Sequence, residues 1–471
     1  MRLPDDFTKQ MRILLGDEDY DKFITALQMP APASVRFNTW KTDSLLLSAF
    51  HSQLDKEIHW CSAGYYLKQR LTFTFDPLFH AGCYYVQEAS SMFLEQVMKQ
   101  YVRKPVVMLD LCAAPGGKST HVQSLLPEGS LLVANEIIRS RFHVLAENLT
   151  KWGYSDLIVT NNAPADFTPL THFFDVILTD VPCSGEGMFR KDTEAINEWG
   201  LENVELCRRR QRRIISDIWA CLKPEGILIY STCTYNTKEN EENVQWMQQE
   251  LGAEPLSVDV PDHWNITGCL TNHTFPVYRF LPYRTEGEGF FMAVLRKPFD
   301  ANNTGKRLSA ITKKNKRKTT IPFSTGGEWL TSPDNYHISV KGAFVTVSPK
   351  NYEGELAILE QALRIVQSGT VIGEIKGKDL IPQQALAMNH LFRQGAFPAE
   401  EVSYKHALAY LRKESFSLSK DTPLGYVLIR YKGVPLGFVK NIGSRLNNLY
   451  PLEWRIRSSY LPEELSIMLN D

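Results

Sequence analysis

The stretch Val106–Ser119, VVMLDLCAAPGGKS, decides the fold of this 471-residue chain. Its first half is an apolar run with β-branched residues, which is typical of a buried strand. The run breaks at Ala113–Gly117 into small residues, and a helix-like segment follows. Small residues let a ligand approach the backbone N–H groups at a helix N-terminus, which favour negative or electron-rich atoms. The stretch therefore predicts a strand, a tight loop and a helix start, with a cofactor site at the loop.

One acidic residue supports this cofactor site. The spacing is not the G-x-G-x-x-G of dinucleotide binders, and a Gly-Gly pair alone is often only a turn. Glu136, however, follows the next apolar run, Leu131–Ala134, nineteen positions after Gly117. In doubly wound folds, an acidic residue about 20 positions past the loop binds ribose hydroxyls. The sequence therefore predicts Glu136 as a ribose ligand.

From Val106 to Pro298, strand-like and helix-like segments alternate, which predicts parallel strands joined by right-handed crossovers. The expected strands are Val106–Leu111, Leu131–Asn135, Leu157–Thr160, Phe174–Thr179 and Gly226–Thr232. The expected helices lie near Gly117–Leu126, Arg139–Lys151, Glu205–Leu222 and Lys238–Leu251. A closing hairpin is expected at Val277–Leu281 and Gly289–Leu295. Such a sheet binds ligands beyond the carboxyl ends of its strands.

The composition is that of an ordinary soluble globular protein, with 43% hydrophobic and 22% charged residues, and the length predicts about three domains. No apolar run approaches the roughly 20 residues of a membrane span, and the first residues lack the apolar core of a signal peptide. We therefore expect a cytoplasmic protein without membrane contact. The eight cysteines include no C-x-x-C pair, so we expect no metal. The net charge of −1 requires any nucleic-acid affinity to come from local patches.

Two further loops follow expected strands at the same sheet edge. Asp180–Gly187 follows one strand and Cys233–Tyr235 follows the next. As neighbours in a doubly wound sheet, these strands would place Cys183 and Cys233 in one cleft with Asp180. A lone cysteine is more often a small buried hydrophobe than a nucleophile. Three loops that bring Cys, Asp and Gly to one edge favour an active site over that reading.

The ordered set of motifs resembles the Sun (Fmu) family of RNA (cytosine-5)-methyltransferases, above all its bacterial members that act on small-subunit ribosomal RNA. Each piece is weak alone, whereas the ordered set is specific. The pieces are SVRFN (34–38), YYVQEASS (84–91), DLCAAPGGKS (110–119), NE (135–136), DVPCSGEGMFRKD (180–192), LKPEGILIYSTCTYNTKENE (222–241) and YVLIRYKGVPLGFVKNIGSRLNNLYPLEWRI (426–456).

The resemblance implies an α/β protein: a Rossmann-like, S-adenosylmethionine-dependent methyltransferase domain with an N-terminal α/β extension and a C-terminal PUA-like, β-rich domain. The expected parts are an N-terminal RNA-binding extension (1–95), the methyltransferase domain (96–298), a basic linker (299–320), a small α/β connecting domain (321–388) and a PUA-like RNA-binding domain (389–471). The implied activity is methylation of C5 of a specific cytosine in 16S ribosomal RNA through a covalent bond between a cysteine and C6.

The resemblance also implies roles for individual residues. S-adenosylmethionine would be bound by Cys112, Ala113, Ala114, Pro115, Gly116, Gly117, Lys118, Glu136 and Asp180. The nucleophile would be Cys233, and Cys183 would assist product release; Asp180 and Lys118 complete the expected catalytic set. The family pattern N-x-D-A/G near the adenine reads Asn161–Pro164 here (NNAP). The adenine contact is therefore either the Ala163 backbone or Asn162.

These residue types suit the chemistry independently of the family. Attack of a thiolate on C6 of cytosine makes C5 enamine-like and able to accept a methyl group. A thiol suits this step because even a small thiolate fraction is strongly nucleophilic. Asp180 can stabilise charge at N3 and the exocyclic amine. Lys118 either holds that carboxylate in place or is a solvated lysine at a helix start.

Ribosomal RNA or the small ribosomal subunit is the expected partner of a monomeric protein. The candidate RNA-binding residues are Arg36, Asn38, Arg190, Lys191, Lys440 and Arg445. Arg36 and Asn38 share a strand face, where simple solvent exposure is the commoner reading. The expected helix Glu205–Leu222 adds an arginine-rich segment that contacts RNA or makes salt bridges. Gln87 and Ser90 precede the central domain and could reach its ligand.

Two other functions remain open at this point. One is C5 methylation of another structured RNA, such as transfer RNA or 23S ribosomal RNA. The other is a non-catalytic ribosome-assembly factor that retained the methyltransferase fold. The presence of both Cys183 and Cys233 disfavours the assembly factor, because binding needs neither thiol.

Overall fold

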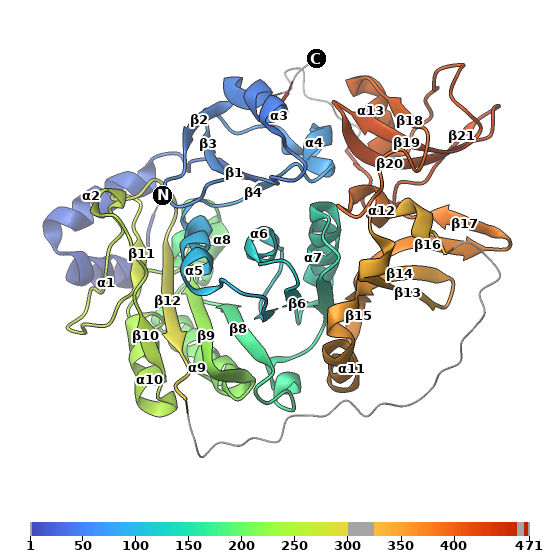
Figure 1. Ribbon diagram of the computed structural model, residues 1–471. Coiled ribbons are helices and arrows are strands. Elements are labelled where there is room, and N and C mark those ends of the chain that lie inside the picture. Colours follow the sequence, from blue (N-terminus) through green and yellow to red (C-terminus); the bar gives the residue numbers. More distant parts are fainter. Residues whose placement is uncertain (1, 300–324, 459–465, 470–471) are drawn as a thin grey trace.

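The computed structural model describes residues 2–299, 325–458 and 466–469 (Figure 1). The expected basic linker, 299–320, therefore lies almost entirely outside the described residues. None of the helices that the structure describes combines the length and apolarity that a membrane crossing needs.

A 9-stranded sheet forms the centre of the molecule, in the order β10-β12-β9-β8-β5-β6-β7-β15, with β11 paired to β12. Its parallel strands are β5 (Val107–Asp110), β6 (Leu131–Asn135), β7 (Leu157–Thr160), β8 (Phe174–Asp180) and β9 (Leu222–Thr232). The antiparallel strands are β10 (Glu254–Leu256), β11 (Tyr278–Phe280), β12 (Phe290–Arg296) and β15 (Ile365–Ser368). The expected doubly wound α/β sheet and its closing hairpin are confirmed.

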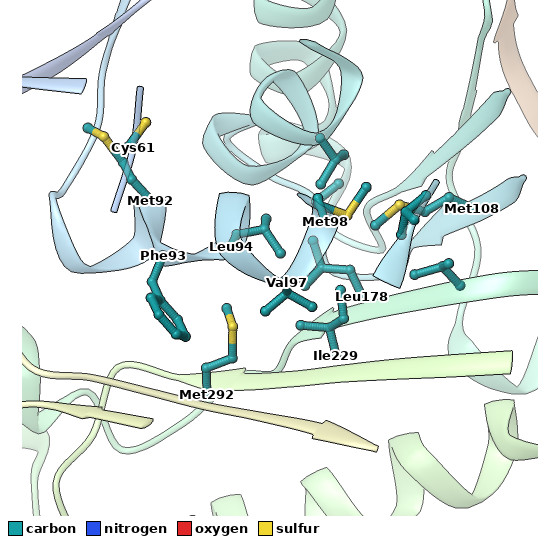
Figure 2. Packing of buried hydrophobic residues seen from close by; sticks show 14 of the residues in the cluster. Cys61, Met92, Phe93, Leu94, Val97, Met98, Met108, Leu178, Ile229 and Met292 are labelled. Atoms are coloured by element: carbon teal, nitrogen blue, oxygen red, sulfur yellow. The ribbon is translucent and has the colours of Figure 1, made fainter. Parts of the chain in front are cut away.

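Helices cover both faces of this sheet (Figure 1). One face carries α5 (Leu94–Tyr101), α6 (Gly117–Leu125) and α7 (Arg139–Trp152), and the other carries α9 (Leu201–Trp219), α10 (Glu241–Leu251) and α11 (Glu353–Ala362). Strands covered on both faces read as nearly continuous apolar runs, which is why they were visible in the sequence. Figure 2 shows Val97 and Met98 of α5 packed over Leu178, Ile229 and Met292 of the sheet.

Three helix boundaries differ from the prediction by three or four residues. The helix expected from Glu205 already begins at Leu201. The helix expected at Glu205–Leu222 ends at Trp219, because Leu222 already pairs with Phe174 as the start of β9. The helix expected from Lys238 begins at Glu241, because the preceding residues form a turn in which Glu239 accepts side-chain and backbone hydrogen bonds.

The N-terminal part has two components. Helices α1 (Asp5–Leu15) and α2 (Asp17–Gln28) pack through Phe7 and Phe23 against Phe189 and Tyr235 of the methyltransferase domain. A four-stranded sheet of order β2-β3-β1-β4 follows. It contains β1 (Ser34–Phe37), β2 (Leu54–Glu57), β3 (Gly64–Leu67) and β4 (Tyr84–Val86), with α3 (Ser44–Ala49) and α4 (Pro77–His80).

Arg36 and Asn38 are not surface residues, which corrects their assignment to RNA. They are 1% and 0% exposed. The Arg36 guanidinium donates to Gln87 Oε1 at 2.9 Å and to Thr120 Oγ1 at 2.7 Å, and it lies 4.4 Å from the ring centre of Trp152. Asn38 donates to the backbone oxygen of Trp152. Both side chains therefore join the N-terminal sheet to α6 and α7.

The segment 321–388, expected as a domain of its own, is divided between two structures. Helix α11 and strand β15 belong to the methyltransferase layers, because β15 pairs with the edge strand β7 and Leu359 of α11 is buried against the sheet. A separate antiparallel sheet has the order β13-β14-β16-β17. It contains β13 (Tyr336–Lys341), β14 (Phe344–Pro349), β16 (Thr370–Lys376) and β17 (Asp379–Pro382), and α12 (Gln384–Met388) follows.

The last part is the expected β-rich domain. Its sheet has the order β18-β19-β20-β21 and contains β18 (Ala399–Glu401), β19 (Gly425–Tyr431), β20 (Val434–Asn441) and β21 (Leu446–Asn448), beside α13 (Tyr404–Arg412). Phe438 and Tyr450 are each 1% exposed, so these rings pack the core. Figure 1 shows this domain beside the N-terminal sheet, and the two share one apolar core.

Candidate active site

The loop between β5 and α6 is fixed by contacts from two neighbouring elements. The Ala113 N–H donates to the backbone oxygen of Asn135 at 2.9 Å. Side chains of α7 donate to two loop carbonyls: Arg141 to Ala114 O and Asn148 to Pro115 O, each at 2.8 Å. Gly116 has φ +112°, a conformation that L side chains rarely adopt. The small residues of the predicted cofactor loop therefore form a rigid turn at the start of α6.

This loop borders a pocket of about 630 Å³ at the carboxyl ends of the parallel strands. Glu136 lines the pocket and is 3% exposed. Its Oε1 accepts the Ile138 N–H at 2.7 Å, and its Oε2 lies 3.8 Å from Nη1 of Arg141. The pocket is also lined by Cys112, Ala114, Ile137, Ala163, Pro164, Asp180, Cys183, Arg210, Arg213 and Cys233.

A smaller pocket of about 170 Å³ shares Cys112, Ala114 and Asp180 with the first. The rest of the predicted loop faces it, with Ala113, Pro115, Gly117 and Lys118 in its wall. Gly116 lines neither pocket. The N-terminal domain closes the other side with Tyr85 and Gln87, whereas Ser90 is buried and donates to Glu288 O.

Asp180 lies where the two pockets meet, at the end of β8. Its Oδ2 accepts a hydrogen bond from Lys118 Nζ at 2.7 Å, and its Oδ1 accepts one from Ser231 Oγ at 2.8 Å. Burial lowers the pKa of Lys118, but the neighbouring Asp180 carboxylate raises it by more, so the pKa lies above its ordinary value. The lysine is therefore a half-buried ammonium paired with Asp180 and not a solvated residue at a helix start.

The two predicted thiols meet in the main pocket. Sγ of Cys183 lies 3.2 Å from Sγ of Cys233, and all eight cysteines are free. The hydrogen bond with Cys233, and then burial, raises the pKa of Cys183 well above its ordinary value. Cys183 is therefore the thiol that holds its proton more tightly than an ordinary cysteine.

Two buried glutamates, which the sequence analysis missed, position the loops of these thiols. Glu186 is 0% exposed; its Oε2 accepts the backbone N–H groups of Tyr235 and Asn236 at 2.7 and 2.8 Å. Glu239 accepts the Ser184 N–H at 3.1 Å and a hydrogen bond from Gln211 at 2.6 Å. Both lie inside motifs quoted above, SGEG and TKENE, where an acid within an otherwise small or polar turn was the available signal.

A third buried acid, Asp110, ends β5 beside the loop. Its Oδ2 accepts a hydrogen bond from Ser119 Oγ at 2.6 Å, and its Oδ1 has no partner among the described residues. Burial raises the pKa of Asp110 to about 7, although the hydrogen bond from Ser119 opposes this change.

The question left open at the NNAP stretch is resolved for one residue. Asn162 exchanges two hydrogen bonds with the backbone of Arg364, at 3.1 and 2.9 Å, and so attaches the segment before β15 to the sheet. Its amide is therefore occupied. Ala163 and Pro164 line the main pocket instead.

The expected RNA-binding residues differ in their availability. The Arg190 side chain is 8% exposed and bonds Glu288 and the backbone oxygens of Ala26 and Gly287. This corrects its assignment to RNA, because its donors are used internally. Lys191 stays exposed, 3.6 Å from Glu288. Lys440, 3.5 Å from Asp379, is partly exposed, and Arg445 is exposed.

The arginines of helix α9 fall into two groups. Arg208 pairs with Glu205 at 2.8 Å, and Arg212 donates to Asn243. Arg210 and Arg213, one turn apart, line the main pocket, are exposed and form no ion pair with a described residue.

Comparison with known proteins gives the same picture along the whole chain. The family model of the 16S rRNA methyltransferase RsmB/F matches residues 100–296, that of the N-terminal domain of 16S rRNA methyltransferase RsmF matches 3–89, and that of the methyltransferase RsmF PUA domain matches 398–456. Proteins named ribosomal RNA small subunit methyltransferase F, from Citrobacter koseri and Erwinia tasmaniensis, are 30% and 31% identical over 96% of this chain and 96% of theirs.

Solved structures share the fold of somewhat less than two thirds of the chain. A methyltransferase homolog protein from Pyrococcus horikoshii is 28% identical, with a TM-score of 0.54, over 62% of this chain and 95% of that chain. The structure of NSun6 from the same organism with SFG is 21% identical, with a TM-score of 0.53, over 63% of this chain and 99% of that one. Because the family models match its N-terminal, central and C-terminal parts in order, the chain belongs to the RsmB/F family of 16S rRNA methyltransferases and is an RNA methyltransferase with the N-terminal and PUA domains of RsmF.

Proposed function

We propose that this chain methylates C5 of one cytosine in 16S ribosomal RNA with S-adenosylmethionine, through a transient bond between Cys233 and C6 of the base. The observation that carries the proposal is the pair of thiols: Cys183 and Cys233 lie 3.2 Å apart in the pocket that Glu136 and Asp180 also line. RNA binding alone has no use for such a pair, which disfavours a non-catalytic assembly factor. The relatives named small subunit methyltransferase F support 16S RNA over other RNAs.

The main pocket fits the proposed cofactor. Its volume of about 630 Å³ lies within the roughly 300–1,000 Å³ of small-molecule sites. Glu136 is a buried carboxylate fixed by the Ile138 N–H, which suits two ribose hydroxyls. Ile137, Ala163 and Pro164 give apolar walls for an adenine ring. When bound, S-adenosylmethionine supplies an electrophilic methyl group.

Cys233 makes the first bond in the proposed reaction. Its thiolate sulfur adds to C6, and the electron pair of the C5–C6 double bond becomes available at C5 to attack the methyl group. The S–H of Cys183 donates to the same sulfur.

Cys183 acts after methyl transfer. Once Cys233 is bonded to C6, its sulfur is uncharged and no longer holds the proton on Cys183. Cys183 can then release that proton to solvent and take the C5 proton, directly or through water; the C–H electrons re-form the C5–C6 bond, and Cys233 leaves as a thiolate. Asp180, held by Lys118 and Ser231, stabilises the base at N3 or its exocyclic amine.

The RNA strand is proposed to cross the exposed side of α9. Arg210 and Arg213 line the pocket and form no ion pair with a described residue. When the target nucleotide flips into the pocket, the phosphates on either side of it lie along this wall, where the two arginines can contact them. Lys191 of the central domain and Lys440 and Arg445 of the PUA domain are proposed as further RNA contacts.

The decisive experiment follows methyl transfer and covalent trapping in the same variants. Full-length protein is incubated with labelled S-adenosylmethionine and either small ribosomal subunits or naked 16S RNA, and the modified base is identified by nuclease digestion. Cys233→Ala should give neither product nor adduct. Cys183→Ala should transfer the methyl group but accumulate a protein–RNA adduct that survives denaturing electrophoresis.

Cys269→Ala is the matched control, because Cys269 is a partly exposed cysteine that lies outside the residues lining the pocket. It should behave like the unchanged protein. If the adduct accumulates in Cys233→Ala instead, the two roles are reversed. If the product is a ribose or N-methylated nucleotide, C5 chemistry is excluded while the pocket assignment stands.

A further inference from the structure

A cluster of side chains of metal-ligating types is buried between the N-terminal sheet and the methyltransferase domain. Cys61 lies in the turn before β3, Glu95 on α5 and His121 on α6, and they are 2%, 1% and 1% exposed. One ligand atom from each residue lies within 4.8 Å of the others. Cys61 Sγ is 3.7 Å from His121 Nε2, and His121 Nε2 is 3.2 Å from Glu95 Oε2.

These distances match the edges of a tetrahedral zinc site. Zinc bonds of about 2.3 Å to sulfur and about 2.0–2.2 Å to nitrogen or oxygen, at tetrahedral angles, place S and N roughly 3.6 Å apart and N and O roughly 3.4 Å apart. The observed edges are 3.7 and 3.2 Å. A thiolate, an imidazole and a carboxylate together suit a borderline ion such as Zn²⁺ more than Mg²⁺ or Ca²⁺.

The surroundings orient the carboxylate toward this cluster. Glu95 Oε1 accepts the Ser62 N–H at 2.9 Å and a hydrogen bond from Lys99 at 2.6 Å, which leaves Oε2 facing His121. Ligating carboxylates are commonly held in this way by a second set of hydrogen bonds. Cys61 and Met92 lie at the edge of the core in Figure 2, and a Cβ at Gly64 would meet the sulfur atoms of both. Because Gly64 has no Cβ, the Cys61 sulfur has room beside Met92 and stays next to His121.

We propose that Cys61, Glu95 and His121 are three of the four ligands of a Zn²⁺ ion that joins the N-terminal sheet to α5 and α6, with a water molecule in the fourth position. Binding forms the S–Zn, N–Zn and O–Zn bonds, releases the thiol proton of Cys61 to solvent and leaves the imidazole proton on Nδ1. The competing explanation is a hydrogen bond between His121 and Glu95 beside a thiol that only packs. Because α6 begins with Gly117 and Lys118, the ion would also stabilise the helix that follows the cofactor loop.

The test measures metal directly, on the full-length protein. Elemental analysis after exhaustive dialysis should find about one zinc per chain, and cobalt added to chelator-treated protein should give a thiolate-to-metal charge-transfer band. Cys61→Ser and His121→Gln should each lose the zinc and the band; glutamine can still donate to Glu95, so folding is less disturbed. Cys83→Ser is the control, since Cys83 is fully buried in the same domain and should retain both.

Metal-free purified protein that takes up neither ion on titration overturns the proposal, and this result does not depend on any variant folding. Stoichiometric zinc retained by both Cys61→Ser and His121→Gln also overturns it, because the ion would then lie elsewhere. Methyl transfer is not the readout, so the outcome is independent of the proposed reaction.

Discussion

Glu186 gives the sharpest test of how the active-site loops are positioned. Its carboxylate accepts five hydrogen bonds: from the Tyr235 and Asn236 N–H groups on Oε2, and from Asn236 Nδ2, Trp199 Nε1 and Gln10 Nε2 on Oε1. In Glu186→Gln, one of these oxygens becomes an NH₂ group that faces donors. If the NH₂ group replaces Oε2, the Tyr235 and Asn236 N–H groups lose their acceptor; if it replaces Oε1, the buried Trp199 Nε1–H does.

Each such loss costs about 1–3 kcal/mol, so the packing around the loop after Cys233 should be destabilised by about 1–6 kcal/mol. If about 3 kcal/mol of this positioning is expressed in the transition state, methyl transfer slows roughly 100-fold. Glu186 does not line either pocket around the cofactor loop, so cofactor affinity should stay unchanged. The measurements are the single-turnover rate of methyl transfer and calorimetric binding of S-adenosylmethionine.

Glu194→Gln is the matched control, because this exposed glutamate lies on α8 (Thr193–Glu198) close in sequence and accepts none of these bonds. It should leave the rate unchanged. A Glu186→Gln rate within about twofold of the unchanged protein would refute the positioning role. A parallel loss of cofactor affinity would show instead that the whole sheet edge is disturbed.

Three further predictions follow from the same geometry. Glu136→Gln should weaken S-adenosylmethionine binding by about 1–3 kcal/mol in calorimetry, and an unchanged affinity removes Glu136 from the cofactor site. Replacing Arg210 and Arg213 with Ala should raise the KM for RNA and lower the salt slope of RNA binding by about 1–2, with cofactor binding as the control. Burial raises the pKa of Asp110 to about 7, so its contribution to stability is greatest below its ordinary pKa of about 4 and is lost as pH rises toward 7. In urea unfolding, the stability difference between the unchanged protein and Asp110→Asn should therefore vary between pH 4 and 7. A constant difference would contradict the raised pKa.

The methyltransferase sheet was readable from the sequence because its strands are buried on both faces. Such strands give unbroken apolar runs, and the functional loops follow them directly at Cys112, Asp180 and Cys233. The edge strand β15 was not readable in this way. Ile365–Ser368 is only partly buried, and it joins the sheet through a partner, β7, about 200 residues earlier. Pairing at that separation leaves no local signal.

The charged residues were the least predictable part of the site. Arg36 alternates with apolar neighbours as an exposed strand residue does, yet it is buried, because Gln87, Thr120 and Trp152 supply its contacts from three other segments. The cluster proposed to bind Zn²⁺ was not foreseen for the same reason. Cys61, Glu95 and His121 come together only through the packing of three elements, so no C-x-x-C spacing marks them.

These contacts give the flanking domains a role besides the proposed RNA binding. Gln10 on α1 bonds the Glu186 carboxylate that fixes the backbone after Cys233, and Arg36 on β1 bonds Thr120, two residues after Lys118. Arg364, before β15, bonds Asn162 next to the pocket wall. Each of these flanking segments therefore makes a hydrogen bond to a residue beside the proposed cofactor site or the thiols. Because a buried polar group that loses its partner costs more than the bond itself contributed, removal of any one segment should disturb the catalytic geometry as well as the affinity for RNA.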